Sequence, residues 1–355
     1  MPGQSWRALR GRLCSIPVGG RELLGNQLGE PAVREVAVYV PAEVDRPVPL
    51  LVALQGFTGS GLMFPGWKPF EESLPQRLDR LIASGAMPPV VLAMPDCFTR
   101  LGGNQYIDNP VLGRWSAFLT EELIPAMEAG FPVRPGRAHR GVLGKSSGGY
   151  GAMWQGLTRA DAWGALACHS GDVDFDLVYR PHLIPALDRL AKALGRPLRG
   201  RDDLDAATSK FLSQFFGSAK VDGTDLNHLM TLAMTATYDP QPDAPDGIRL
   251  PLDPYTGALD REAWSRWLHW DPLRRVHHPE ALAGLRTLRG VFLDCGSRDQ
   301  YSLAYGARAL SRALSHHGVA HTYEEFDDNH SSIAYRFDVS LPWLAHRLTA
   351  DPNES

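Results

Sequence analysis

The stretch GVLGKSSGGYG, residues 141–151, restricts what this chain can fold into more than any other part of the sequence. It contains two overlapping motifs that belong to different folds. Gly144-Lys145-Ser146 matches the end of a phosphate-binding loop, in which a lysine and a hydroxyl reach a nucleotide. The same residues followed by Ser147 and Gly148 match G-x-S-x-G, which presents a nucleophilic serine at a sharp turn between a strand and a helix.

The residues before Gly144 favour the second motif. A phosphate loop needs a glycine five positions earlier, because glycines at both ends let backbone N–H groups curl around the anion. That position holds His139, and Arg140–Leu143 has the pattern of a short apolar strand leading directly into the turn, with a helix able to begin near Ser147. The segment therefore predicts Ser146 as a nucleophile, although the motif alone is weak evidence in a chain with 35 glycines.

Short β-rich runs alternate with helical patterns along most of the chain. This alternation is typical of a mostly parallel sheet with helices on both faces, and it places the chain in the α/β class. The expected strands are residues 35–41, 49–54, 89–94, 140–143, 164–168, 290–294 and 321–326. The expected helices are residues 70–84, 115–129, 147–157, 302–317 and 331–348.

The alternation is interrupted once, between the strands that end at Cys168 and begin at Gly290. About 120 residues lie there, where a loop in such a fold usually has about 2 to 6. We therefore expect residues 172–280 to form a helical cap inserted into a catalytic domain made of residues 1–171 and 281–355. Helical patterns within the insertion occupy residues 183–194, 206–216, 226–236 and 261–270.

Three tryptophans, Trp264, Trp267 and Trp270, recur at every third position of the last of these helices. At this spacing they lie along one side of the helix. Two interpretations fit: the rings pack the cap onto the sheet domain, or they line a pocket for an acyl or aromatic substrate.

The overall composition excludes several function classes. With 44% hydrophobic and 21% charged residues, the chain can build a large core. Its net charge of −4 lacks the positive excess typical of proteins that bind nucleic acid. It has no apolar run of about 18 residues that could span a membrane. The N-terminus lacks the apolar stretch of a secretory signal, so we expect a cytoplasmic protein.

The cysteines and paired histidines do not form a recognisable metal site. The histidine pairs 277–278 and 316–317 lack partners at metal-ligand spacing. The four cysteines are scattered without a C-x-x-C motif, so we expect reduced and mostly buried thiols and no bound metal. They are Cys14, Cys97, Cys168 and Cys295.

A serine hydroxyl becomes a nucleophile when a histidine takes its proton and a carboxylate orients that histidine. In sheets of the type that carries G-x-S-x-G, the three residues follow in the order serine, acid, histidine, each after the end of a strand. Asp299 follows the strand at 290–294, and His330 follows the strand at 321–326. The sequence therefore predicts a triad of Ser146, Asp299 and His330.

Other acids and histidines stay open as alternatives. Asp294 ends the strand that leads to Asp299, and Asp172 follows the preceding strand. His169 also follows that preceding strand, which is too early for the histidine of such a triad. Three further histidines lie before the last strand: His316, His317 and His321.

An oxyanion hole is expected from an earlier strand-to-loop turn together with the residue after the nucleophile. The stretch LLVALQGFTGSG, residues 50–61, provides such a turn after Gln55 and Gly56. The backbone N–H of Phe57 and that of Ser147 are the two candidate donors.

With these motifs in place, the sequence resembles the putative-esterase branch of the α/β-hydrolases, which includes S-formylglutathione hydrolases, enterochelin and feruloyl esterases, and mycolyltransferases. The matching stretches are VPLLVALQGFTG, WSAFLTEELIPAM, GKSSGGYGAM, LDCGSRDQY and DDNHSS. The resemblance implies an α/β-hydrolase fold, a triad of Ser146, Asp299 and His330, and an oxyanion hole of Phe57 and Ser147. It covers the sheet domain at both ends of the chain.

Three departures limit what can be transferred from these relatives. Ser147 stands where many of them have methionine, Gln55 stands where many have histidine, and the cap is larger than in formylglutathione hydrolases. The expected function is therefore a serine carboxylesterase acting on a small-molecule ester without a cofactor, with Gln55, Trp264 and Trp267 as candidate substrate-binding residues. An acyltransferase with the same acyl-enzyme, or a non-catalytic binding module on a hydrolase scaffold, are the alternatives.

Overall fold

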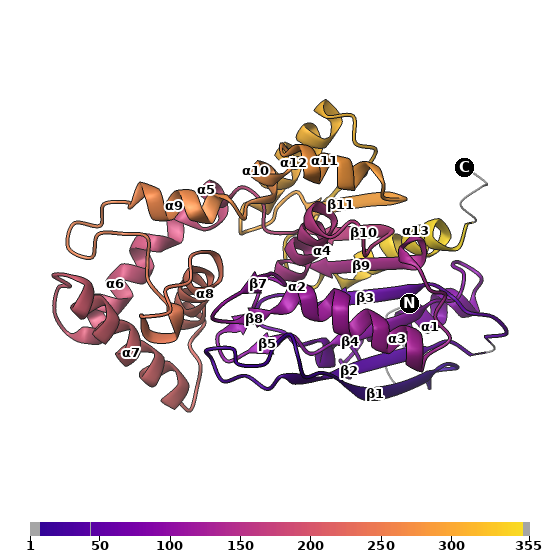
Figure 1. The fold of residues 1–355 in the computed structure, drawn as a ribbon, viewed down its shortest axis with the longest axis horizontal. Coiled ribbons are helices and arrows are strands. Elements are labelled where there is room, and N and C mark those ends of the chain that lie inside the picture. The colour runs from indigo at the N-terminus through magenta and orange to yellow at the C-terminus, as the bar shows by residue number, and fades with distance from the viewer. Residues whose placement is uncertain (1–7, 43, 351–355) are drawn as a thin grey trace.

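An eight-stranded sheet forms the centre of the protein (Figure 1). The structure, a computed structural model, describes residues 8–42 and 44–350. The second strand in sequence runs antiparallel to both of its neighbours, and all other pairs are parallel. In spatial order the strands are β1 (Arg12–Gly19), β2 (Val33–Val40), β4 (Val91–Pro95), β3 (Leu50–Leu54), β9 (Arg140–Lys145), β10 (Ala165–His169), β11 (Gly290–Gly296) and β12 (Thr322–Phe326).

The parallel arrangement confirms the expected fold class and determines where a site can form. The carboxyl ends of β3, β9, β10, β11 and β12 all lie at one edge of the sheet. Loops that follow neighbouring parallel strands meet at such an edge, which is where sites occur in α/β proteins.

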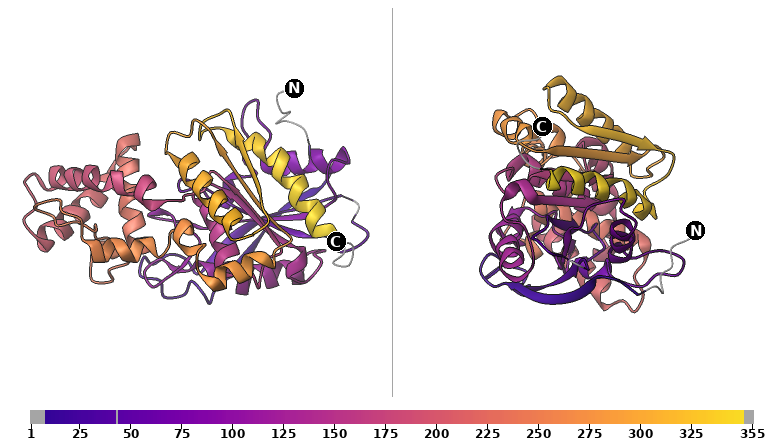
Figure 2. Two further views of the ribbon diagram at one scale, coloured as in Figure 1. Left: turned by 90° about the horizontal axis from the view of Figure 1, so that it is seen from above. Right: turned by 90° about the vertical axis from the view of Figure 1, so that its right-hand side faces the viewer.

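Helices cover both faces of the sheet (Figure 2). One face packs against α1 (Leu74–Ala83) and α13 (Phe337–Thr349), whose buried residues include Leu78 and Leu344. The other face packs against α4 (Ser147–Thr158) and α12 (Leu303–His316), and α11 (Pro279–Arg286) lies against α4. The two cores are what the alternation of apolar strands and amphipathic helices predicts.

β1 is the strand of the main sheet that the sequence pattern does not predict. Its inward residues are Cys14, Ile16 and Val18, of which only Val18 is fully buried. Pro17 lacks an N–H group, and proline in a sheet is tolerated at an edge such as this one. The weak alternation of three small apolar residues is the only signal for this strand, because an edge strand buries little surface.

The predicted helix at residues 115–129 is divided into three parts. α2 (Trp115–Ala117) passes into a π-helical turn (Phe118–Leu123), and α3 (Ile124–Gly130) follows. Pro125 is near the start of α3 and has no N–H to donate to the preceding turn. The missing donor favours the π-helical turn just before Pro125, in which hydrogen bonds span five residues instead of four.

The long segment between β10 and β11, residues 170–289, is mostly helical; we refer to it as the inserted segment. Its larger part lies beside the sheet, whereas its last residues, which include α11, lie against α4 (Figure 1). Before α11, its helices are α5 (Phe175–Val178), α6 (Leu183–Leu194), α7 (Arg201–Gly217), α8 (Gly223–Tyr238), α9 (Arg261–Leu268) and α10 (Pro272–Arg275). The four helices predicted for this segment are all present. α6 packs against α7 and α8, whereas α10 returns to contact α4 and α12.

The three tryptophans divide between two roles. Trp267 is fully buried and Trp264 is 4% exposed, with their ring centroids 5.3 Å apart. Trp270 follows α9 and packs against Trp154 of α4, with centroids 5.2 Å apart. Trp270 therefore joins the inserted segment to the sheet domain, and the other two lie in the interior of the inserted segment.

The cysteines agree with the expectation from their spacing. Cys97, Cys168 and Cys295 are buried, Cys14 is half-buried, and none of the four takes part in a disulfide. Over residues 8–42 and 44–350, no helix has the length and apolar character needed to cross a bilayer.

Candidate active site

Ser146 lies at the sharp turn between β9 and α4. Its backbone has φ 59° and ψ −127°, a conformation that is unfavourable for a residue with a side chain. The N–H of Ser146 donates to the carbonyl of His169 at 2.9 Å, and its carbonyl accepts from the N–H of Tyr150 at 2.8 Å. This is the elbow geometry that the G-x-S-x-G motif predicts.

The glycines of the motif are required by close backbone approach. A Cβ atom on Gly148 would lie 2.1 Å from the carbonyl oxygen of Leu54, and one on Gly144 would lie 2.4 Å from the carbonyl carbon of Gly148. α4 therefore begins directly against the end of β3. The loop that follows β3 is thereby placed beside the nucleophile.

Asp299 and His330 come from different loops and meet at the same edge of the sheet. Asp299 follows β11, and His330 follows β12. Nδ1 of His330 lies 2.7 Å from Oδ2 of Asp299, and both residues are buried. Because an ionised carboxylate can only accept, this contact assigns the proton to Nδ1 and leaves Nε2 as a base.

The acid and the histidine are held by their neighbours in the same two loops. The main-chain N–H of His330 donates to Oε1 of Gln300 at 2.9 Å. The ring of Tyr301 packs edge-on against the imidazole, with centroids 5.0 Å apart, and the main-chain N–H of Tyr301 donates to Oδ1 of Asp299 at 2.9 Å. None of these contacts uses Nε2 of His330.

The alternative acid Asp294 and the alternative histidine His169 bind each other instead. Nδ1 of His169 lies 2.7 Å from Asp294, and Nε2 lies 2.8 Å from the hydroxyl of Ser340 in α13. Arg336 donates to the second oxygen of Asp294 at 2.9 Å. His169, Asp294 and Ser340 are at most 2% exposed, so no ester can reach this arrangement.

The carboxylate of Asp172 forms its hydrogen bonds with residues other than His330. Its carboxylate accepts from the hydroxyl of Tyr179 at 2.7 Å and from the amide of Gln105 at 3.0 Å. Burial raises the pKa of Asp172, and these two hydrogen bonds work against that shift. Burial also lowers the pKa of Lys145, the residue before the nucleophile, against the opposing effect of the Asp299 charge.

Phe57 lies in the loop that follows β3, close to Ser146. A Cβ atom on Gly56 would lie 3.4 Å from the Cβ of Ser146. The carbonyl of Phe57 accepts from the N–H of Gly103 at 2.8 Å, and a Cβ on Gly102 would lie 2.6 Å from the Phe57 ring. A short hairpin, β5 (Phe98–Thr99) with β6 (Gly102–Gly103), therefore clamps this residue.

Ser147 provides the second candidate donor for an oxyanion. It is the first residue of α4. The first N–H groups of a helix have no partner within the helix, and they are a common place for an anion to bind. Phe57 follows β3 and Ser147 follows β9, and these two strands are neighbours in the sheet.

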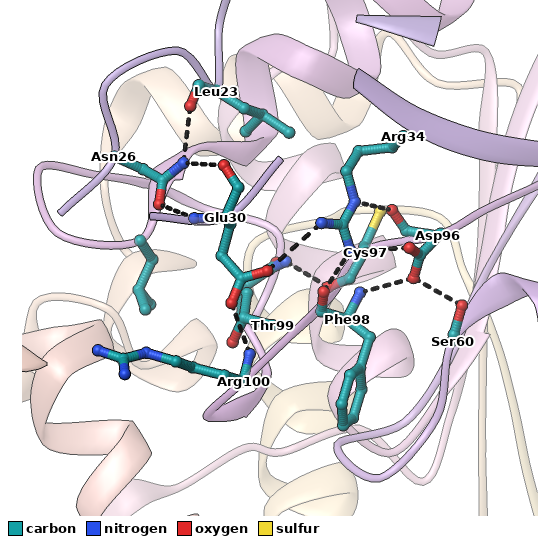
Figure 3. Close-up of polar contacts among 12 residues, drawn as sticks. Leu23, Asn26, Glu30, Arg34, Ser60, Asp96, Cys97, Phe98, Thr99 and Arg100 are labelled. Atoms are coloured by element: carbon teal, nitrogen blue, oxygen red, sulfur yellow. Dashed lines mark hydrogen bonds and ion pairs between the residues drawn. The ribbon is translucent and has the colours of Figure 1, made fainter. Parts of the chain in front are cut away.

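A buried arginine anchors the loop that carries Phe57 (Figure 3). Asp96, which follows β4, accepts from the hydroxyl of Ser60 at 2.7 Å and from Arg34 of β2 at 2.8 Å. Arg34 is 6% exposed and also contacts the carboxylate of Glu30 at 3.5 Å. Ser60 thereby ties the loop to the strands beside it, which restricts the movement of the candidate donor.

The other polar contacts in Figure 3 continue this network toward the N-terminal part of the chain. The side-chain amide of Asn26 donates to the carbonyls of Leu23 and Glu30, both at 2.8 Å. Glu30 accepts the main-chain N–H of Arg100 at 2.7 Å. Arg34 also donates to the carbonyl of Phe98 in β5, so the network holds the hairpin beside Phe57 as well as Ser60. None of these anchoring residues is predicted as functional from the sequence.

Gln55 shapes the turn before Phe57. Its carbonyl accepts from the hydroxyl of Tyr106 at 2.6 Å, and its side chain accepts from the N–H of Gly56 at 3.1 Å. A Cβ atom on Gly59 would lie 2.1 Å from the Gln55 side chain. These contacts give Gln55 a role in the loop itself, and a contact with substrate stays a prediction, as it does for Trp264 and Trp267.

Solved structures share this architecture over nearly the whole chain. A ferulic acid esterase superposes with a TM-score of 0.59 at 17% identity, covering 96% of this chain and 100% of the other. An S-formylglutathione hydrolase from Agrobacterium tumefaciens has a TM-score of 0.55 at 19% identity, covering 96% and 97%. One from Staphylococcus aureus has a TM-score of 0.52 at 13% identity, covering 94% and 99%. At these identities the similarity establishes the α/β-hydrolase fold.

Sequence comparison identifies the family. A search among curated proteins returns no match. The family model described as "Putative esterase" matches residues 31–342, which is most of the chain and includes every candidate site residue. This chain therefore belongs to the putative esterase family and is an ester-hydrolysing enzyme with the α/β-hydrolase fold.

Proposed function

We propose that the chain is a serine carboxylesterase that works through an acyl-enzyme, with Ser146 as nucleophile, His330 as general base and Asp299 as its acidic partner. The observation that carries this proposal is the 2.7 Å contact between Nδ1 of His330 and Oδ2 of Asp299, at the sheet edge where the strained elbow presents Ser146. This contact orients the imidazole of His330.

Acylation follows from the proton positions. Nε2 of His330 takes the hydroxyl proton of Ser146 as Oγ bonds to the ester carbonyl carbon, and the carbonyl oxygen becomes negative. The N–H groups of Phe57 and Ser147 bind that oxygen. His330 then gives the proton to the leaving alcohol oxygen, the carbon–oxygen bond breaks, and the acyl group remains on Ser146.

Deacylation repeats these steps with water. His330 takes a proton from the water molecule as its oxygen bonds to the acyl carbon, and the same two N–H groups bind the oxyanion. The proton then returns to Oγ of Ser146, and the carboxylic acid leaves. Asp299 stabilises the imidazolium in both halves of the reaction.

We also propose that residues 172–280 act as one cap. The packing of α6 against α7 and α8 beside the sheet supports this proposal. The Trp154–Trp270 contact and the contacts of α10 with α4 and α12 would hold the C-terminal part of the cap against the body.

The proposed function predicts turnover of simple carboxylic esters. The purified chain should hydrolyse p-nitrophenyl acetate, and the absorbance of the released p-nitrophenol measures the rate. A panel of graded acyl length should show which acyl group is preferred. It includes methyl ferulate and the thioester S-formylglutathione, because the structural neighbours include a ferulic acid esterase and two S-formylglutathione hydrolases. A folded protein that hydrolyses no member of the panel would contradict the proposal.

Gly102→Ala tests the contact that holds Phe57. The added methyl group would press on the Phe57 ring, and we expect kcat to fall roughly tenfold, because deleting an oxyanion donor costs about 10²- to 10³-fold and displacing one costs less. Gly136→Ala is the matched control, since Gly136 has φ 97° against 99° for Gly102 but has nothing within 4 Å of the added carbon. Equal losses of kcat in the two variants would show that backbone strain, and not the Phe57 contact, is responsible.

A further inference from the structure

Five residues other than glycine adopt positive φ close to the elbow. They are Gln105 (58°), Tyr106 (58°), Ser146 (59°), Ser170 (43°) and Asp174 (67°). Such backbone conformations persist where surrounding contacts impose them, and they gather at functional sites. The nucleophile elbow accounts for Ser146 alone. Of the other four, Ser170 and Asp174 lie on either side of Asp172 in the chain, and the remaining two are its partner Gln105 and the next residue, Tyr106.

The carboxylate of Asp172 joins the sheet domain to the inserted segment. Its Oδ2 atom accepts from the hydroxyl of Tyr179 and from Nε2 of Gln105, at 2.7 and 3.0 Å. The hydroxyl of Tyr238 lies 3.0 Å from the same nitrogen and 3.3 Å from the Tyr179 hydroxyl. Tyr179 and Tyr238 belong to the inserted segment, and Gln105 belongs to the sheet domain.

The same carboxylate oxygen reaches the residue that follows the nucleophile. The hydroxyl of Ser147 donates to Oδ2 of Asp172 at 3.5 Å, and Ser147 is 2% exposed. Ser147 begins α4, and its backbone N–H is the second donor of the proposed oxyanion hole. A chain of hydrogen bonds thus runs from Tyr179 through Asp172 to this residue.

The buried polar group formed by Asp172, Gln105 and Tyr179 is unfavourable for stability, and we take this as an indication that it serves another purpose. Burial raises the pKa of Asp172, and the hydrogen bonds from Tyr179 and Gln105 and the charge of His330 only partly oppose it, while the charge of Asp299 adds to it. Oε1 of Gln105 is buried without a hydrogen-bond partner. Apolar residues of similar shape would avoid both costs, and proteins keep such unfavourable groups mainly at functional sites.

We infer that Asp172 is a positioning residue through which Tyr179 of the inserted segment holds Ser147 in the orientation that the oxyanion requires. The inference rests on the proposed function, because it assigns a task within that reaction. The negative oxygen exists only in the transition state, so loosening Ser147 should lower kcat and leave KM nearly unchanged.

Tyr179→Phe is the most conservative test. It removes the hydroxyl that binds Asp172 and keeps the ring that packs against Phe175 and Trp267. We expect kcat for p-nitrophenyl acetate to fall roughly tenfold with KM within twofold, a smaller loss than complete removal of an oxyanion donor. Thr237→Val is the matched control, because the Thr237 hydroxyl is equally buried in the inserted segment but bonds only within its own helix, to Ala233 at 2.8 Å. Its kcat should stay within twofold of the wild type.

A double-mutant cycle tests the route through Ser147. Once Ser147→Ala has removed the hydroxyl at the end of the chain of bonds, Tyr179→Phe should lower kcat by less than a further twofold, because coupled groups are not additive. A tenfold loss in both backgrounds would overturn the inference. So would an unchanged kcat in Tyr179→Phe, or a loss of the same size in Thr237→Val.

Asp172→Asn separates positioning from a purely structural role. The folded-state pKa of Asp172 lies above its unfolded value, so the ionised carboxylate lowers stability as the pH rises through the folded pKa, and this cost is fully present above it. Asparagine cannot ionise, so at pH 8 the variant should keep or raise its melting temperature while kcat falls at least tenfold. A lower melting temperature with unchanged kcat would indicate a structural role and overturn the inference.

Failure of the inference about Asp172 can be distinguished from failure of the proposed function. If the wild-type protein hydrolyses no ester, or if hydrolysis does not depend on Ser146, the reaction itself is wrong. If hydrolysis depends on Ser146 and Tyr179→Phe behaves like Thr237→Val, only the inference about Asp172 is wrong.

Discussion

Ser146→Ala is expected to lower kcat on p-nitrophenyl esters by about 10⁴- to 10⁶-fold, the range found when a triad loses its nucleophile. The substitution removes one oxygen atom. The backbone strain at φ 59° is the same for alanine, since both residues carry a Cβ atom, so the melting temperature should change little. Steady-state hydrolysis and thermal unfolding followed by circular dichroism measure the two effects separately.

Ser332→Ala is the matched control for this substitution. Ser332 also has a positive φ, of 54°, lies two residues after His330, and is exposed. Its side chain makes no capping hydrogen bond to the short helix that follows. We expect its kcat to stay within twofold of the wild type. More than a tenth of wild-type activity in Ser146→Ala would exclude Ser146 as the nucleophile. A comparable loss in Ser332→Ala would show that the loss in Ser146→Ala is not specific to the nucleophile position.

Asp299→Asn should have the second-largest effect, a loss of about 10⁴-fold in kcat. The new amide can donate toward Nδ1 of His330, which would move the imidazole proton to Nε2 and leave no base facing the serine. The measurement is kcat on the same ester, with urea unfolding to show that the protein remains folded.

Asp294→Asn is the comparison that identifies the acid. Asp294 lies within β11 and binds His169 and Arg336 in the protein interior. Its replacement should therefore leave kcat within about threefold of the wild type. It should lower the free energy of unfolding by about 3 kcal/mol, the lower end of the range for breaking a buried ion pair. The reverse result, with activity lost in Asp294→Asn and retained in Asp299→Asn, would identify Asp294 as the acid and contradict the assignment of Asp299.

The sheet and the candidate triad are predictable from the sequence because they depend on local patterns and on chain order. The strands that carry the site are continuous apolar runs, as in GVLG and GVFLD, which strands buried on both faces require. Strand alternation favours Asp299 over Asp294 as the proposed acid. Phe292 and Asp294 are two residues apart in β11 and therefore face the same side, toward α13, whereas Asp299 lies beyond the strand.

The anchoring contacts are not predictable from local patterns. Arg34 and Asp96 are 62 residues apart, and Gln105 and Asp172 are 67 residues apart. In the sequence, Arg34 is one charged residue at the start of an apolar run, with nothing to distinguish it from an exposed residue. Only the packing of β2 against β4 turns it into a buried anchor.

The central claim is that the oxygen of Ser146 carries the acyl group during turnover. Its most direct test is to react the protein with a fluorophosphonate, which phosphonylates the nucleophile of a serine hydrolase, and to locate the adduct by mass spectrometry of peptides. The claim predicts one adduct per chain, on the peptide that contains Ser146, and none in Ser146→Ala. An adduct on a different residue, or an active enzyme that takes up no label, would contradict it.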